Sequence, residues 1–221
     1  MIDLLFNIRN TDPLTLVFTF LSYTMIIFLA LPVHEFAHAF AADKMGDHTP
    51  RWNGRLTLNP FAHLDFFGAL LIFLFGFGYA RPVPVNPRNF RDYRKGIIVT
   101  ALAGPLSNLA MSLLSLVLLR ILYFVIPITV LSHIAGILLY TFAQINIYLA
   151  VFNLMPVPPL DGYRIISNFL PPRWAYFIER NQWYITIVFL VVILSNRFGY
   201  IISFLAEPIY KLFLIITGLY Y

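Results

Sequence analysis

The sequence predicts an all-helical membrane protein that crosses the bilayer about five to six times. Two observations carry this prediction. Of the 221 residues, 60% are hydrophobic and only 11% are charged, whereas soluble domains average about 45–50% and about 25%. The apolar residues also gather in long runs, and a run of roughly 20 is what a helix needs to cross the hydrocarbon core.

The predicted transmembrane helices follow one another along the chain. The first three occupy residues 14–42, 97–125 and 133–152, and the C-terminal part adds two more near 183–194 and 200–217. No linker or internal repeat divides the chain. We therefore expect a single domain over residues 1–221, with its core in 14–170 and accessory C-terminal helices in 175–221.

A further apolar run, residues 68–80, is shorter and carries three glycines. Basic residues flank it on both sides, and cytoplasmic loops carry the excess of Lys and Arg. The flanking residues are Lys44, Arg51 and Arg55 before the run, and Arg81, Arg88, Arg91, Arg94 and Lys95 after it. Both flanks are thus predicted to be cytoplasmic. The run would be a re-entrant or membrane-surface segment between the first and second spans, and the alternative is a further full span.

The end of the first span carries the pattern His34-Glu35-Phe36-Ala37-His38. Residues four apart share one face of an α-helix, so both histidines can direct a ring nitrogen at one ion. Glu35 projects at an adjacent angle, suited to accept a proton from water at the metal rather than to bind the metal. The pattern predicts a zinc site with Glu35 as general base. The alternative is a solvated helix end with two incidental histidines.

The depth of this site follows from helix geometry. At about 1.5 Å per residue, His38 lies roughly 9 Å and His34 roughly 15 Å inward of Lys44 along the helix axis. If Lys44 marks the interface, the metal lies below the cytoplasmic membrane surface. Ionisable groups at such a depth are costly and are functional candidates for that reason.

Catalytic zinc needs a third protein ligand and an open position. The best candidate is Asp161, which follows an apolar span broken by Pro156, Pro158 and Pro159. Irregular backbone at membrane depth occurs where it is buried in protein or lines a wet cavity. Asp161 would then be a metal ligand, or it would cap the short helix that follows it. The residues alone leave both possibilities open.

Four stretches of the chain resemble the site-2 protease family of intramembrane zinc metalloproteases, in its compact prokaryotic branch. They are "HEFAH" at 34–38, "GRLTLNPFAHLD" at 54–65, "ALAGPLSN" at 101–108 and "FNLMPVPPLDG" at 152–162. The resemblance implies that His34, His38 and Asp161 bind one catalytic Zn²⁺ and that Glu35 is the general base. Larger members carry PDZ or CBS domains, and we expect neither here.

Other polar residues within the apolar helices have less specific predictions. The resemblance suggests that Asn153 and Asn108 hold the substrate backbone or orient the site, whereas a buried amide more often bonds a neighbouring helix. Gly104 is expected to allow close helix packing. His63 and Asp65 are expected to make turn and cap hydrogen bonds rather than to bind metal.

The predicted function is that of an intramembrane zinc metalloendopeptidase, which hydrolyses peptide bonds within or near transmembrane helices of membrane-protein substrates. The expected partners are such substrates and the lipid bilayer, not nucleic acid. We expect a multi-pass protein of the cell membrane with its active site towards the cytoplasm. The alternatives are a membrane metal-ion transporter, since intramembrane His and Asp also form ion paths, and a catalytically silent scaffold.

Overall fold

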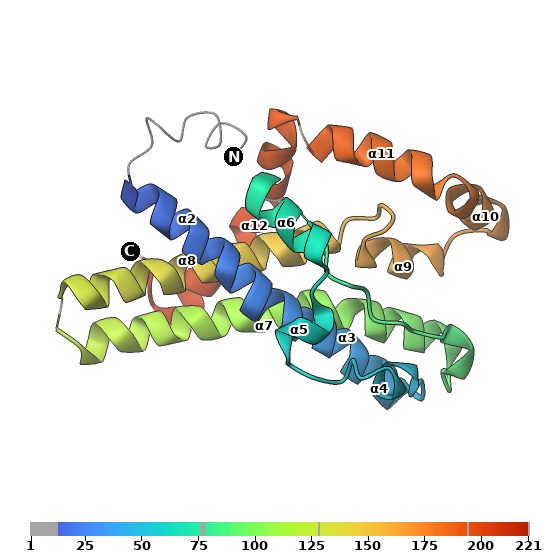
Figure 1. The fold of residues 1–221 in the computed structure, drawn as a ribbon, viewed down its shortest axis with the longest axis horizontal. Coiled ribbons are helices and arrows are strands. Elements are labelled where there is room, and N and C mark those ends of the chain that lie inside the picture. Colours follow the sequence, from blue (N-terminus) through green and yellow to red (C-terminus); the bar gives the residue numbers. More distant parts are fainter. Residues whose placement is uncertain (1–12, 76–77, 128, 194, 221) are drawn as a thin grey trace.

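The computed structural model describes residues 13–75, 78–127, 129–193 and 195–220. Throughout this part the regular structure is helical, as predicted, and no strand occurs in it (Figure 1). The elements are α2 (Pro13–Met25), the π-helical turn η2 (Ile26–Ala30), α3 (Leu31–Met45), α4 (Thr49–Trp52), α5 (Pro60–His63), α6 (Phe66–Phe75), the 3₁₀ turn η3 (Pro87–Asn89), α7 (Tyr93–Val125), α8 (Val130–Asn153), α9 (Asp161–Ser167), α10 (Pro172–Arg180), α11 (Gln182–Ile193) and α12 (Asn196–Thr217).

Within these residues, four helices are long and apolar enough to cross a membrane. They are Phe20–Met45, Tyr93–Val125, Val130–Asn153 and Phe198–Thr217, and each overlaps a predicted span. The remaining predicted span corresponds to α11, which has 12 residues. A helix of this length is about 18 Å long, which is less than the roughly 30 Å of the hydrocarbon core.

The first long helix runs without a break from α2 through η2 into α3. A π-helical turn inside an α-helix shifts the side-chain register and is common next to functional sites; here it directly precedes the turn that carries His34. The helix ends at Gly46, which has a φ of 110°, a backbone conformation that residues other than glycine rarely adopt. The metal pattern is thus near the end of a continuous helix.

Helices α7 and α8 form an antiparallel hairpin at the centre of the molecule (Figure 1). At the start of α8, the Thr129 hydroxyl accepts from the Ser132 backbone N–H and the Ser132 hydroxyl accepts from the Thr129 N–H. This reciprocal capping satisfies donors that a helix start otherwise leaves unpaired. Along the hairpin, the Ser115 hydroxyl donates to the Leu139 carbonyl at 2.8 Å, which sets the register of the pair. Helix α3 packs beside α7.

The short apolar run, residues 68–80, turns back so that its last residues lie beside its first. Its helix α6 has ten residues, about 15 Å by helix geometry. The Arg81 N–H donates to the His63 carbonyl at 2.8 Å, and an added β-carbon on Gly68 would lie 1.9 Å from the Tyr79 carbonyl oxygen. The start and the end of this segment therefore lie side by side, which agrees with a re-entrant or membrane-surface segment. A full crossing by residues 68–80 does not fit these contacts.

A buried carboxylate joins the loops at the end of α3. Asp47 is fully buried and accepts from the Thr49 backbone and hydroxyl, from the Asn86 backbone and from the Asn89 amide. Burial alone would raise the pKa of Asp47, but these hydrogen bonds outweigh burial and hold its pKa below the ordinary value. Asp47 thus holds the segment that leads into α7 against the end of the helix that carries the metal pattern.

Candidate metal centre

Three buried side chains meet at one point between α3 and α9. Nε2 of His38 lies 3.0 Å from Nε2 of His34 and 3.1 Å from Oδ2 of Asp161. Nε2 of His34 lies 3.3 Å from the same Oδ2. Each residue is at most 8% exposed. Two ligands bound tetrahedrally to zinc at about 2.0–2.1 Å stand about 3.3 Å apart, so the three predicted ligand atoms have the spacing that a zinc ion needs.

Local structure explains why Asp161 reaches this point. The chain turns back after α8, and α9 begins at Asp161 with Leu160 as its cap residue. An added β-carbon on Gly162 would lie 2.1 Å from the Leu154 carbonyl oxygen, so this close return of the chain requires glycine. The helix-capping alternative for Asp161 is wrong here. Asp161 is itself the first helical residue, and its side chain faces the two imidazoles instead of capping α9.

Helix α7 closes the third side of the cluster at Gly104. An added β-carbon on Gly104 would lie 2.4 Å from Nε2 of His38 and 2.6 Å from Nε2 of His34. Only a glycine leaves space in front of the two ring nitrogens. Gly104 does allow close packing of α7 on α3, as expected, but the space it leaves is at the ligand atoms. The residues present therefore fit a bound metal ion.

The second ring nitrogen of each histidine has a different environment. Nδ1 of His38 is 2.7 Å from the Thr100 carbonyl oxygen, so it is the donor and Nε2 is left with its lone pair towards the cluster. Nδ1 of His34 is buried and has no hydrogen-bond partner among the described residues. A metal-ligating histidine ordinarily donates this proton to a carboxylate, a carbonyl or water.

The predicted general base lies beside the cluster and is not part of it. Glu35 is partly exposed and lies on the turn of α3 between the two histidines. A cationic group is close to it: burial and nearby Arg81 lower the pKa of the Arg55 guanidinium, and the Glu35 carboxylate acts in the opposite direction. Arg55 is 7% exposed and donates to the carbonyl oxygens of Ala62 and Arg81.

In the sequence, Arg55 served only as one of the basic residues that predict the cytoplasmic side. The hydrogen bond between the Thr100 carbonyl and His38 was not predicted. The Thr100 contact is made by the backbone, which has no residue-type pattern. A buried arginine can be inferred only once the loop around it is known.

The remaining predicted site residues lie around this centre. Asn108 is 1% exposed, one turn along α7 from Gly104, and both polar atoms of its amide have no partner among the described residues. Asn153 is the last residue of α8, and its amide N–H donates to Leu149 of the same helix at 2.9 Å. His63 bonds the Thr57 carbonyl, and Asp65 accepts from the Gly68 N–H. These two make turn and cap bonds, as expected.

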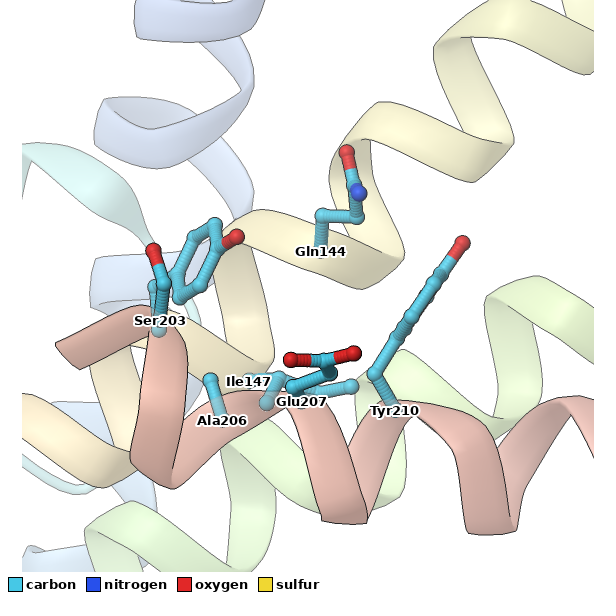
Figure 2. A pocket seen from close by; sticks show the side chains of 7 residues that line it. Gln144, Ile147, Ser203, Ala206, Glu207 and Tyr210 are labelled. Carbon is cyan, nitrogen blue, oxygen red and sulfur yellow. The ribbon is translucent and has the colours of Figure 1, made fainter. Parts of the chain in front are cut away.

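A separate cavity of about 220 Å³ lies between α8 and α12 (Figure 2). In Figure 2 the Glu207 carboxylate lies below Gln144 and beside Tyr210, and Glu207 also pairs with Lys211 at 2.6 Å. None of the three clustered residues lines this cavity. The metal cluster and the cavity are therefore distinct places in the fold.

Comparison with known proteins agrees with these features. The profile of peptidase family M50 matches residues 126–195, which include Asp161. A protein of Bacillus subtilis named "putative zinc metalloprotease YwhC" is 40% identical over 202 residues, covering 86% of both chains. Proteins with the same kind of name are similar in Mycolicibacterium smegmatis (Rip2, 29% identical, 86% of this chain and 80% of the relative) and in Methanocaldococcus jannaschii (MJ0611, 28%, 73% and 78%). No solved structure matches.

Proposed function

Because this chain belongs to peptidase family M50, the site-2 protease family, and is a zinc metalloendopeptidase, we propose that it cleaves its substrates within or near their transmembrane helices. We further propose that the active site faces the cytoplasmic side of the cell membrane. The observation that supports this is the buried cluster of His34, His38 and Asp161, because both of its histidines belong to the membrane-spanning helix Phe20–Met45. Only a peptide bond that reaches membrane depth meets such a site.

In this proposal, His34, His38 and Asp161 hold the zinc ion, which when bound supplies the Lewis acidity that lowers the pKa of a water and polarises a carbonyl oxygen. Glu35 accepts a proton as the water oxygen bonds to the peptide carbonyl carbon. The C–N bond then breaks, and Glu35 returns the proton to the leaving amine nitrogen. The second proton of the water passes from the new carboxylic acid to the amine, so the products are a carboxylate and an ammonium group, and protons and electrons balance.

Other residues around the cluster are proposed to orient the ligands and to hold the substrate. Thr100 holds the His38 ring in the orientation that leaves Nε2 towards the cluster. Asn108 has an unpartnered buried amide one turn from Gly104, which supports a role in holding the substrate backbone or a water. Asn153, which was also predicted to hold the substrate or orient the site, is here the weaker candidate, because its amide N–H already donates to a carbonyl of α8. The substrate helix must unwind locally, since a helical peptide hides its carbonyls in its own hydrogen bonds.

Glu35→Gln tests the proposal. Zinc content should stay unchanged, because Glu35 is not part of the cluster, while cleavage should fall by about 10²–10⁴-fold, the usual contribution of a general base. Mass spectrometry of membranes from cells with wild-type or Glu35→Gln protein should reveal fragments severed within a transmembrane segment only in the wild type. Wild-type cleavage rates in the variant, or fragments confined to soluble domains, would contradict the proposal.

A further inference from the structure

Helix α10 has two chemically different faces and is exposed on both. Its sequence is Pro172-Arg-Trp-Ala-Tyr-Phe-Ile-Glu-Arg180. Helical spacing places Trp174, Phe177 and Ile178 on one face, and Arg173, Glu179 and Arg180 on the other. Trp174 is 61% and Phe177 is 56% exposed, although their rings contact one another at 6.4 Å between centroids. No residue of α10 is buried, and only Ala175 and Ile178 are partly covered, so most of the apolar face is not covered by the described part of the protein.

The position of α10 in the fold is as informative as its composition. In Figure 1 it lies at the end of the molecule where α7 begins, beyond α9 and joined to α11. That end is basic, since Arg91, Arg94 and Lys95 are exposed at the start of α7. The apolar ends of α7 and α8 lie at the opposite end of the figure. Helix α10 therefore lies at the level where the membrane-spanning helices meet the aqueous phase.

This arrangement matches the chemistry of the headgroup layer. Helices with aromatic residues on one face and arginines on the other lie in the plane of the interface, and tryptophan and tyrosine prefer that depth. With nine residues, about 14 Å long, α10 is too short to cross. Neither Arg173 nor Arg180 forms an ion pair within the described residues, so both guanidinium groups are available to phosphate.

We propose that α10 is a membrane-surface anchor: Trp174, Phe177 and Ile178 enter the headgroup–acyl boundary, and Arg173 and Arg180 bind the phosphates of anionic phospholipids. The site would take a phosphodiester with a net negative charge, such as phosphatidylglycerol, in the leaflet at the basic end of the molecule. This proposal depends on the membrane-embedded fold and not on proteolytic activity.

The anchor has a consequence for the metal centre. Asp161 begins α9, whose seven residues extend about 10 Å, and four residues link α9 to α10. A helix held at the headgroup level therefore limits the depth of Asp161 to the length of α9, about 10 Å, plus that of the extended linker, roughly 14 Å. This agrees with the depth of roughly 9–15 Å that the distance from Lys44 gives for the two histidines.

The position of Trp174 tests the proposal directly. The variant Trp52→Phe/Trp183→Phe leaves Trp174 as the reporter, because the chain has three tryptophans. In liposomes of phosphatidylcholine brominated at one acyl position, bromines near the headgroup should quench Trp174 more than bromines near the terminal methyl. Stronger quenching by aqueous acrylamide than by any brominated lipid would overturn the proposal, and so would the deepest bromines quenching most.

The preference for anionic lipid is the second test. Brominated phosphatidylglycerol should quench Trp174 more strongly than brominated phosphatidylcholine. Arg173→Gln/Arg180→Gln should remove this preference, because each arginine near an anionic surface strengthens lipid attraction by about fivefold. Arg173→Lys/Arg180→Lys should keep it. The matched control Arg88→Gln/Arg94→Gln removes two exposed arginines outside α10, one in η3 and one at the start of α7, and should also keep it. Equal preference in the Gln variant and this control would overturn the role of the two arginines.

Discussion

Oδ2 of Asp161 lies 3.1 Å from Nε2 of His38, although 123 residues separate them along the chain. The contact forms because the chain turns back closely after α8, and because α7 offers no side chain at Gly104 to keep the two groups apart. The candidate metal centre of this protease therefore depends on three separate segments, and the contribution of each can be tested by substitution.

Asp161→Asn should lower zinc affinity by roughly 100-fold or more, since it removes the only charged atom of the cluster that faces both imidazoles. Cleavage should be lost in proportion at low zinc. Competition with a chelator of known zinc affinity measures the effect. Asp65→Asn is the matched control, because that carboxylate accepts from the Gly68 N–H and not from a cluster residue. Equal zinc affinity in both variants would remove Asp161 from the ligand set.

Gly104→Ala should reduce zinc content and cleavage together. Its β-carbon would lie 2.4–2.6 Å from imidazole atoms of His38 and His34, so both rings or α7 must shift. A misplacement of about 1 Å in a catalytic site costs about 10²-fold in rate. Gly199→Ala is the control, because nothing lies within 4 Å of its added β-carbon. Full zinc binding in Gly104→Ala would show that the cluster has more space than the contacts indicate.

Gly68→Ala should loosen the re-entrant segment, because the added carbon would lie 1.9 Å from the Tyr79 carbonyl oxygen, a backbone atom. The helix α6 and the exit of the segment would have to separate. Limited proteolysis from the side that carries Arg81 should then cut residues near Tyr79 faster in the variant than in the wild type. Unchanged cleavage rates, with Gly199→Ala as reference, would contradict the side-by-side arrangement.

Asp47→Asn should lower the melting temperature at neutral pH and lose this effect in acid. The pKa of Asp47 is depressed in the folded protein, so its contribution to stability is present above the ordinary aspartate pKa of about 3.9 and is lost as pH falls through the lower folded value. Losing charge-assisted hydrogen bonds costs about 2 kcal/mol.

Melting curves of detergent-solubilised protein between pH 7 and pH 3 measure this difference. The gap between wild type and Asp47→Asn should narrow below about pH 4. Glu179→Gln, which changes an exposed carboxylate, should show no comparable gap at neutral pH. A gap for Asp47→Asn that stays constant across the range would mean that its hydrogen bonds do not depend on charge.

Much of the fold could be predicted because its causes are local. A helix needs an apolar run of a given length to cross lipid, and the spans that became α3, α7, α8 and α12 have it. The face shared by His34 and His38 follows from four-residue spacing within one helix. The return of residues 68–80 followed from the basic residues on both flanks, which a membrane-spanning segment would have placed on opposite sides.

The role of Asp161 could not be predicted from the residues around it. A single aspartate before a short helix can cap that helix or bind a distant partner, and its own neighbours favour neither. The choice depends on the position of α3, which the sequence between them does not encode in any pattern. The same holds for Gly104 and for the Thr100 carbonyl, since a missing side chain and a backbone oxygen acquire a role only from what packs against them.

By itself, the sequence determined that this is a helical membrane protein and where its candidate metal-binding histidine pair lies, because hydropathy and helical periodicity act over one segment at a time. Only the tertiary structure placed the carboxylate of a second segment, and a glycine of a third, beside this pair. Coordination requires atoms within a few ångströms, and only packing sets distances between segments that are remote along the chain.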